Sequence, residues 1–370
     1  MAIDISKYTK LILKIAKEGF KKGFNKVFDE KLASTIFDDL NTAASAGYGD
    51  KWIKFDPYHS PTVQQLQKNL LFFSVGKSAE QLKAMNALLI DEKGKIRNWQ
   101  SFRDEVLKMN KQYNLRYLQA EYQTSKSSAQ MARKWQEAQK RKHLYPNLKY
   151  LTVHDSHVRE EHAKLHGIVR PIDDPWWDTH YPPNGWRCRC SAQSTRDAVT
   201  PKDKIPHVPV HKHFRHNVGK TGKIFDEKHP YFKHLTKSIF RKLSKEADNR
   251  LAIYTANKVR QWAKDNLVGK AITAKDKPKF ILTGRDIKVI TFKPHKYRWI
   301  RNNMLYDINK YYKESKLVHT AFEMKGRKKY KYWYYYEVGI EGKKFYLNIV
   351  MLANGEKKLH AITDSIIKKE

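Results

Sequence analysis

The chain has 370 residues, of which 40% are hydrophobic and 12% aromatic, so it is long enough for two or three domains with packed cores. Its 73 Lys and Arg against 38 Asp and Glu give a formal net charge of +35, which favours nucleic acid, an anionic membrane surface or an acidic protein as partner; a generally lysine-rich composition is the alternative explanation. No run of about 18 apolar residues occurs and the first ten residues lack a signal-peptide layout, so we expect a soluble protein without a membrane span, made in a cytoplasm.

Residues 5–45 place apolar side chains at helical spacing, among them Leu11, Ile12 and Ile15, with lysines on much of the other face. This pattern predicts an amphipathic helix or helix pair. We expect it to pack on its own domain; a helix lying on a membrane surface is the alternative.

Residues 47–61 are rich in turn formers, and the helical period returns from residue 62 to about residue 140. Ser101 and Asp104 have the Ser-x-x-Asp spacing of a capping box, which predicts a helix start there. The expected helices cover residues 63–73 and 78–89, a segment that opens near residues 98–101, and residues 113–140.

Residues 145–154 partly alternate apolar and polar side chains and predict a strand, and residues 187–194 predict a second strand that pairs with it. The segment between them, residues 154–190, contains both cysteines of the chain, five of its 16 histidines and three of its nine tryptophans. This density of special residues predicts an ordered, mostly non-helical unit held by aromatic packing or by a metal.

Cysteine and histidine side chains in this unit suit a structural Zn²⁺, which accepts thiolate and imidazole in a tetrahedral site. Two cysteines one residue apart on a strand point to the same face, whereas a disulfide between them would be strained. The alternative is that the cysteines are buried packing residues and the histidines hydrogen-bonded core groups. The candidate ligands are His162, Cys188 and Cys190, with Asp155, His166 or His180 as the fourth.

Three arginines and three tryptophans accompany these residues. For Arg189 and its neighbours Arg159 and Arg187, a salt bridge to Asp155, Asp173 or Asp178 is favoured over contact with nucleic acid. Trp176, Trp177 and Trp186 lie among prolines and acids, so we expect core and loop anchors rather than surfaces for base stacking.

Residues 198–275 begin with a basic segment rich in proline and histidine, which predicts an extended connector up to residue 225, followed by a helix over about residues 232–264. From residue 276 onward the chain carries 22 Lys and Arg against 10 Asp and Glu. Strands are expected at residues 280–284 and 287–292, then a helix over 296–316, then an antiparallel meander with hairpin turns at 341–342 and 354–355.

The long pattern of rare residues in the central segment resembles the head-morphogenesis domain of tailed bacteriophages, the family of the phage Mu minor head protein. The residues that carry the resemblance are Asp155, Arg159, His162, Leu165-His166-Gly167, the run from Asp174 to Trp186, and Cys188-Arg189-Cys190. A more diffuse likeness extends back to about residue 65. The resemblance implies assembly rather than catalysis for this domain.

Residues 276–370 are similar in layout to small nuclease-like domains of the barnase–EndoU–colicin–RelE class, which are attached to many head-morphogenesis proteins. Cleavage of RNA would need a general base, a general acid and cations around the phosphate. The alternative is a basic binding domain without activity. The candidate catalytic residues are His295, His319, Lys325 and Tyr346, and the candidate nucleic-acid contacts are Lys293, Lys296, Arg298, Arg301, Arg327, Lys328 and Lys329.

The sequence therefore predicts a multidomain α+β protein with four parts: an N-terminal helical segment (1–60), a head-morphogenesis domain (61–197), a basic linker and helix (198–275) and an α+β nuclease-like or nucleic-acid-binding domain (276–370). The resemblance implies a minor head protein of a phage or prophage. It would associate with the portal, scaffold or major capsid protein in the procapsid, in the cytoplasm of a bacterial host and in the virion. The alternative is an effector or toxin that cleaves RNA or DNA through residues 276–370.

Overall fold

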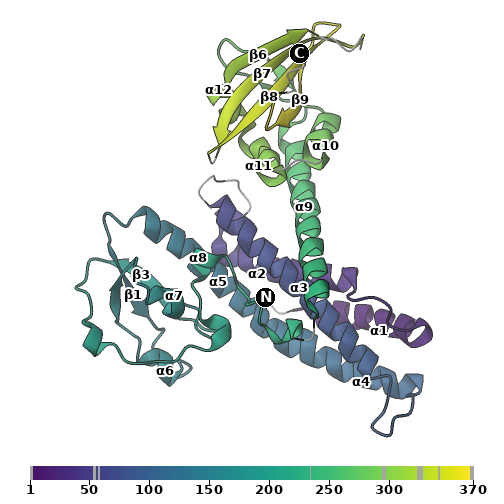
Figure 1. The fold of residues 1–370 in the computed structure, drawn as a ribbon, viewed down its shortest axis with the longest axis vertical. Coiled ribbons are helices and arrows are strands. Elements are labelled where there is room, and N and C mark those ends of the chain that lie inside the picture. Colours follow the sequence, from purple (N-terminus) through teal and green to yellow (C-terminus); the bar gives the residue numbers. More distant parts are fainter. Residues whose placement is uncertain are drawn as a thin grey trace. The chain divides into compact units, whose positions relative to one another are not determined.

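The computed structural model describes residues 3–52, 56, 59–233, 235–293, 297–322, 328–340 and 342–366. The chain divides into two compact units, one of residues 1–53 and 59–247 and the other of residues 54–58 and 248–370 (Figure 1). Helices dominate the first unit, and a four-stranded antiparallel sheet with helices makes up most of the second. The predicted multidomain α+β class is confirmed.

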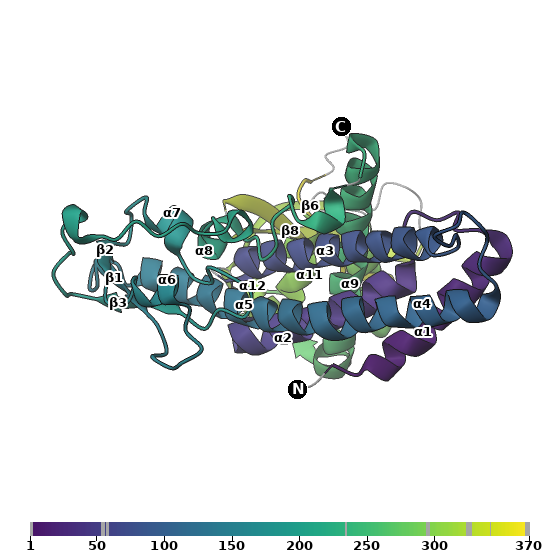
Figure 2. The same ribbon diagram turned by 90° about the horizontal axis from the view of Figure 1, so that it is seen from below.

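The first unit begins with the helices α1 (Ile5–Lys22) and α2 (Glu30–Tyr48), which confirm the predicted helix pair. Each start is capped by an aspartate side chain: Asp4 accepts from the Ser6 N–H, and Asp29 accepts from the Leu32 N–H. The apolar face of α1 is buried within its own unit, as expected. Helix α2 packs against both α3 (Ser60–Ala87) and α5 (Leu118–Lys140) (Figure 2).

Helix α3 is a single continuous helix, so the prediction of two helices over residues 63–73 and 78–89 was wrong. The residues expected between them, from Ser74 to Lys77, are buried and helical. Gly76 lies at a close approach, because a Cβ there would come 2.1 Å from the Phe232 ring. Burial on all sides removes the amphipathic pattern from the middle of the helix without ending it.

Helix α4 (Trp99–Lys111), a π-helical turn (Gln112–Tyr117) and α5 follow one another without a break. The predicted capping box at Ser101 was wrong, because the helix begins earlier. The Asn98 side chain is the N-cap and accepts from the Ser101 N–H at 2.9 Å. Asn is as effective as Ser at this position.

A small sheet follows α5 and confirms that two strands pair here, although the second begins at Ser191 rather than at residue 187. Strand β1 (Asn147–Leu151) lies between β2 (Val169–Pro171) and β3 (Ser191–Thr195), and both neighbours pair with it in antiparallel orientation. Two short helices, α6 (Glu160–Ala163) and α7 (Trp177–His180), lie in the loops between the strands (Figure 1). Pairing of β1 with β3 closes residues 152–190 into one unit, as expected.

The basic segment after β3 was expected to be an extended connector, and this prediction was wrong. Its residues Phe214, Val218 and Phe225 are buried, and Gly219 lies against the Trp135 side chain of α5. Apolar residues spaced along a Lys- and His-rich segment are enough to fold it onto the helices. The elements are η3 (Lys202–Lys204), η4 (Lys212–Phe214), α8 (Val218–Thr221) and η5 (Pro230–Phe232).

Helix α9 (Lys237–Leu267) contains the division between the two units, and the second unit ends in the predicted antiparallel meander. Gly355 has φ +88°, which suits the Asn-Gly turn between the last two strands. The strands are β6 (Lys316–Phe322), β7 (Tyr330–Ile340), β8 (Lys343–Leu352) and β9 (Lys357–Thr363), in this order across the sheet.

Helices pack against one face of the meander. The hydrophobic core of the second unit contains side chains from both the helices and the strands. The second strand predicted at residues 287–292 was wrong, since Gly284–Phe292 is helix α10. Its start carries a capping box in which the Thr283 hydroxyl and the Asp286 carboxylate accept each other's backbone N–H groups. The remaining elements are β4 (Ala271–Ile272), β5 (Phe280–Ile281), α11 (Arg298–Asn303), η6 (Met304–Asp307) and α12 (Ile308–Glu314).

Candidate metal centre

Three side chains with metal-binding atoms meet in the central segment of the first unit. The ligand atoms of His162, Cys188 and Cys190 all lie within 4.8 Å of one another, and all three residues are buried. His162 Nδ1 lies 3.7 Å from the Cys188 sulfur and 3.6 Å from the Cys190 sulfur. Thus the structure brings together three of the four residues predicted as ligands.

Local backbone structure explains this convergence. His162 lies in α6, whereas Cys188 and Cys190 lie immediately before β3 rather than on it. The chain turns sharply at Arg187, whose φ is +57°, and the Cys188 N–H then donates to the Gly185 carbonyl at 3.2 Å. The prediction of a strand at the Cys-x-Cys step was therefore wrong, although both sulfurs still face the same histidine.

The two thiols have different proton affinities because they share a hydrogen bond. Contact with Cys190 and with His162 lowers the pKa of Cys188 to about 4, against the opposing effect of burial. The same contact and burial raise the pKa of Cys190. The contact between the two sulfurs therefore favours the thiolate form at Cys188 over that at Cys190. A buried thiolate beside an imidazole is the type of ligand that soft or borderline metal ions bind.

The other candidate fourth ligands lie elsewhere. Both oxygens of Asp155 accept from the Arg189 guanidinium at 2.6 Å, which confirms the predicted salt bridge of this arginine. His166 accepts from the Thr152 N–H, and His180 stacks on Trp176 with ring centroids 4.6 Å apart. Within the described part of the chain, none of these three residues belongs to the cluster.

The tryptophans of the segment are packing residues, as predicted. Trp177 is fully buried, and Trp176 lies between its ring and that of His180. Trp186 contacts Phe214, and its ring also stacks on Phe225 with centroids 5.9 Å apart. These contacts hold the loops around the cluster in place.

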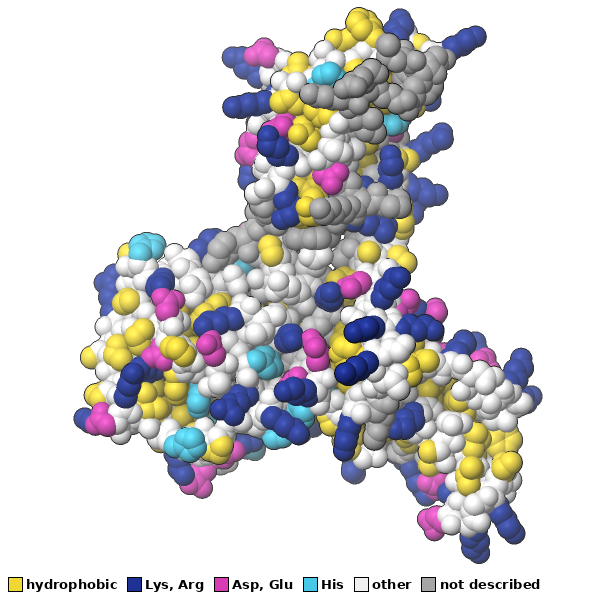
Figure 3. Space-filling view, viewed as in Figure 1, with side chains coloured by type: hydrophobic (Ala, Val, Ile, Leu, Met, Phe, Trp, Pro, Cys, Tyr) yellow, Lys and Arg dark blue, Asp and Glu magenta, His cyan; other side chains and the backbone are white. Residues whose placement is uncertain are grey.

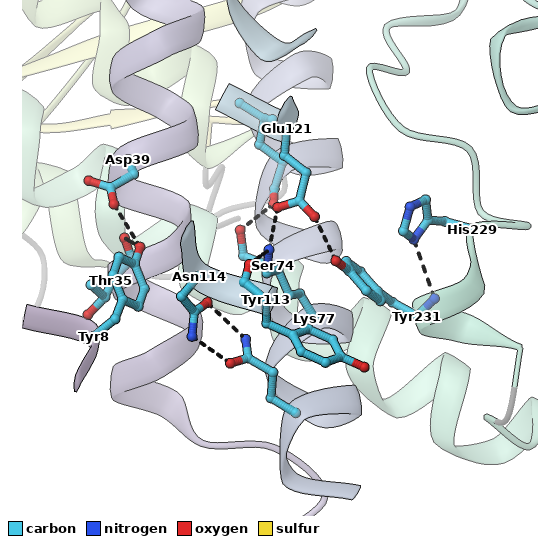
Figure 4. Close-up of polar contacts among 12 residues, drawn as sticks. Tyr8, Thr35, Asp39, Ser74, Lys77, Tyr113, Asn114, Glu121, His229 and Tyr231 are labelled. Atoms are coloured by element: carbon cyan, nitrogen blue, oxygen red, sulfur yellow. Dashed lines mark hydrogen bonds and ion pairs between the residues drawn. The ribbon is translucent and has the colours of Figure 1, made fainter. Parts of the chain in front are cut away.

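A second polar cluster lies inside the helices of the first unit (Figure 4). The Lys77 amine contacts Glu121 and donates to the Tyr113 carbonyl at 2.7 Å, and the Tyr231 hydroxyl donates to the other Glu121 oxygen at 2.7 Å. Sequence analysis missed this network, because a single lysine in a helix gives no sign of burial. The partners lie 36 to 110 positions apart in the chain.

The candidate catalytic residues of the second unit are not brought into one site by the described strands. His319 lies on β6 and Tyr346 on β8, with β7 between them, which separates them by roughly 10 Å across the sheet. His319 packs on Tyr335 instead. His295 and Lys325 lie outside the described residues.

The candidate nucleic-acid contacts differ in their exposure to solvent. Arg301 is only 2% exposed and donates to the Lys293 carbonyl, so the prediction of a surface contact was wrong for this residue. Burial lowers its pKa to about 10. Arg298 is half-buried, whereas Lys293, Lys328 and Lys329 are exposed. Lys296 and Arg327 lie outside the described residues.

Comparison with known proteins finds similarity in the central segment. A family model described as Phage Mu protein F like protein matches residues 79–193. The "Putative capsid assembly protein F" of Escherichia phage Mu is 53% identical over 51 residues, which are 14% of this chain and 12% of that protein. The "Mu-like prophage FluMu F protein" of Haemophilus influenzae is 37% identical over 79 residues, which are 21% of this chain and 19% of that protein.

The matched segments thus span less than a fifth of either relative's length. No solved structure matches the chain. The family match ends at residue 193, so the likeness of residues 276–370 to a nuclease stays a prediction. Residues 79–193, which contain all three members of the cluster, are thus similar to the Phage Mu protein F-like family.

Proposed function

We propose that this chain is a phage or prophage protein that acts in assembly of the head. The observation that carries the proposal is the match of residues 79–193 to the Mu F-like family, whose relative in phage Mu is named a putative capsid assembly protein. In the described residues of this domain, aromatic side chains pack around buried polar side chains. Such a fold suits a structural role.

The partners in this proposal are the other proteins of the head: the portal, scaffold or major capsid protein. The chain would meet them in the procapsid within the host cytoplasm and remain in the virion. Its excess of Lys and Arg favours acidic surfaces and packaged nucleic acid as neighbours. Figure 3 shows Lys and Arg side chains across the visible face with Asp and Glu scattered among them. Among the described helices, none combines the length and the apolar character that crossing a bilayer requires.

A particle-association experiment tests the assembly role. The phage or prophage that encodes the chain is induced with the gene intact or deleted, and the particles are separated on a density gradient. We expect the tagged chain to sediment with procapsids and heads, and the deletion to reduce the yield of complete heads. A chain that stays at the top of the gradient, together with normal heads in the deletion strain, would contradict the proposal.

A zinc ion at the His162, Cys188 and Cys190 cluster is the second part of the proposal. Two buried sulfur donors and one imidazole nitrogen fit the ligand preference of Zn²⁺, and a water or a partner's side chain would complete a tetrahedral set. The ion would hold α6 to the segment before β3. It would act as a cross-link beside the small sheet, which consists of the three short strands β2, β1 and β3.

Elemental mass spectrometry of the purified full chain measures this directly. We expect one zinc per chain in the wild type and a loss of zinc in His162→Ala. The matched control is His166→Ala, four residues further on and outside the cluster, which should retain the metal. Wild-type protein without zinc after growth in zinc-supplemented medium would remove the ion from the proposal and leave the assembly role untouched.

A further inference from the structure

A cationic pocket opens beside the cysteine pair, on one face of α5. Lys126, Gln130 and Lys134 follow one another at intervals of four residues, so they lie along the same face of the helix. Residues 186–191 form the opposite wall. The pocket has a volume of about 870 Å³, large enough for a polymer segment rather than a single ion.

The Asp, Glu, Lys and Arg side chains that line this pocket are all cationic. In the described part of the chain it contains five Lys and Arg residues and no Asp or Glu. Arg189 is neutralised by Asp155, and Arg159 donates to the Trp186 carbonyl. The other three have no carboxylate within ion-pair distance among the described residues; they are Lys126, Lys134 and Arg187.

The two walls are tied together by a backbone contact. The Arg187 N–H donates to the hydroxyl of Thr124 on α5 at 3.3 Å, and Thr124 is fully buried. Arg187 is therefore held close to the helix that carries the two lysines. A cluster of like charges at fixed positions repels itself unless an anion occupies the site.

We propose that this pocket binds the phosphodiester backbone of nucleic acid, without reading sequence. Lys126 and Lys134 lie eight residues apart on α5, about 12 Å along the helix, which is enough to contact more than one phosphate of a strand. The neutral lining groups include Ser and Gln side chains, which commonly accompany Lys and Arg at phosphates.

Base stacking plays no part in this site. Trp186, the aromatic residue of the lining, already packs against Phe214 and Phe225. Contact through the backbone alone predicts sequence-independent, salt-sensitive binding. The inference does not depend on the head-assembly role, because a head protein can assemble without touching nucleic acid.

Fluorescence anisotropy of a short labelled duplex of arbitrary sequence, titrated with the full chain over a salt series, tests the site. The variant is Lys126→Ala/Lys134→Ala, and the control of equal charge is Lys17→Ala/Lys21→Ala on the exposed face of α1. Removing two phosphate contacts should lower the slope of log K against log salt by about 2 and weaken binding at low salt on the order of tenfold or more. The control should keep the wild-type slope.

Two outcomes would overturn the assignment. Equal losses in the variant and the control would show that binding is spread over the whole basic surface. Preference for labelled polyglutamate over the duplex, abolished only in Lys126→Ala/Lys134→Ala, would make the ligand an acidic protein segment. Unchanged zinc content and unchanged thermal unfolding of the variant would establish that its fold is intact.

Discussion

The amine of Lys77 lies 2.5 Å from the carboxylate of Glu121, and their side chains are only 0% and 3% exposed. A buried ion pair is stable only when further hydrogen bonds satisfy both groups, because removing two charges from water costs several kcal/mol for each. Tyr113 and Tyr231 supply those bonds. The pair thereby connects α3, the π-helical turn, α5 and the segment after α8.

Breaking this pair on one side should destabilise the first unit strongly. Lys77→Met leaves the Glu121 charge buried without its cation, and we expect a loss of about 3–5 kcal/mol in the free energy of unfolding. Lys77→Met/Glu121→Gln, which buries no charge and keeps an acceptor for Tyr231, should lose less than the single variant. Urea denaturation followed by tryptophan fluorescence measures both.

The control for this pair is Lys108, which forms an exposed salt bridge with Glu105 on α4. Its replacement by Ala should change the free energy of unfolding by less than about 1 kcal/mol. If Lys77→Met cost no more than Lys108→Ala, the buried network would not contribute to stability as described.

Acid should destabilise the chain through His229. Burial, with smaller effects from His213 and Lys77, lowers the pKa of His229 from 6.5 to about 3. Between these two values the unfolded chain binds a proton that the folded chain does not, so stability is lost as the pH falls from about 6.5 towards 3. His229→Asn cannot take up this proton but can still accept from the Tyr231 N–H as a cap.

We therefore expect the free energy of unfolding to fall less between pH 7 and pH 5 in His229→Asn than in the wild type, by about 2 kcal/mol. Urea titrations at the two pH values give this difference directly. Equal losses in both proteins would show that His229 is not the group responsible.

Because two helices approach each other closely at Gly47, replacing this residue should destabilise the fold. A Cβ at this position in α2 would lie 2.0 Å from the Lys126 carbonyl oxygen of α5, and backbone cannot move aside cheaply. Gly47→Ala should therefore cost about 1–3 kcal/mol although Ala is the better helix former. Gly284→Ala in α10 meets no atom within 4 Å and should be neutral or stabilising by up to about 1 kcal/mol. Thermal unfolding of the two variants makes the comparison.

The response to a chelator should distinguish a variant of a metal ligand from a variant of a neighbouring residue. If zinc is bound at the cluster, removing it with a chelator should lower the unfolding temperature of the wild type, since a bound ion contributes folding free energy. Cys190→Ser should be insensitive to the chelator. Asp155→Asn should keep the wild-type response, because Asp155 pairs with Arg189 rather than with the cluster. A loss of response in Asp155→Asn would place this carboxylate among the ligands.

Periodicity in the sequence was enough to predict elements whose environment is simple. Helix α1 buries one face, and β7 is rich in the aromatic residues that favour strands. Helix α10 was missed because its β-branched Ile287, Val289 and Ile290 suggest a strand. The Thr283–Asp286 capping box was the local signal that would have identified it.

The sequence by itself determined the donor types of the candidate metal centre, the one-residue spacing of Cys188 and Cys190, and the likeness of the central segment to the Mu F-like family. Only the tertiary structure decided that, among the described residues, none of the candidate fourth ligands joins His162 and the two sulfurs, and that Asp155 belongs to Arg189. The physical reason is that these side chains converge through antiparallel pairing of β1 with β3 and through the turn at Arg187. Such long-range contacts, like the one between Lys77 and Glu121, leave no periodic signal in the chain.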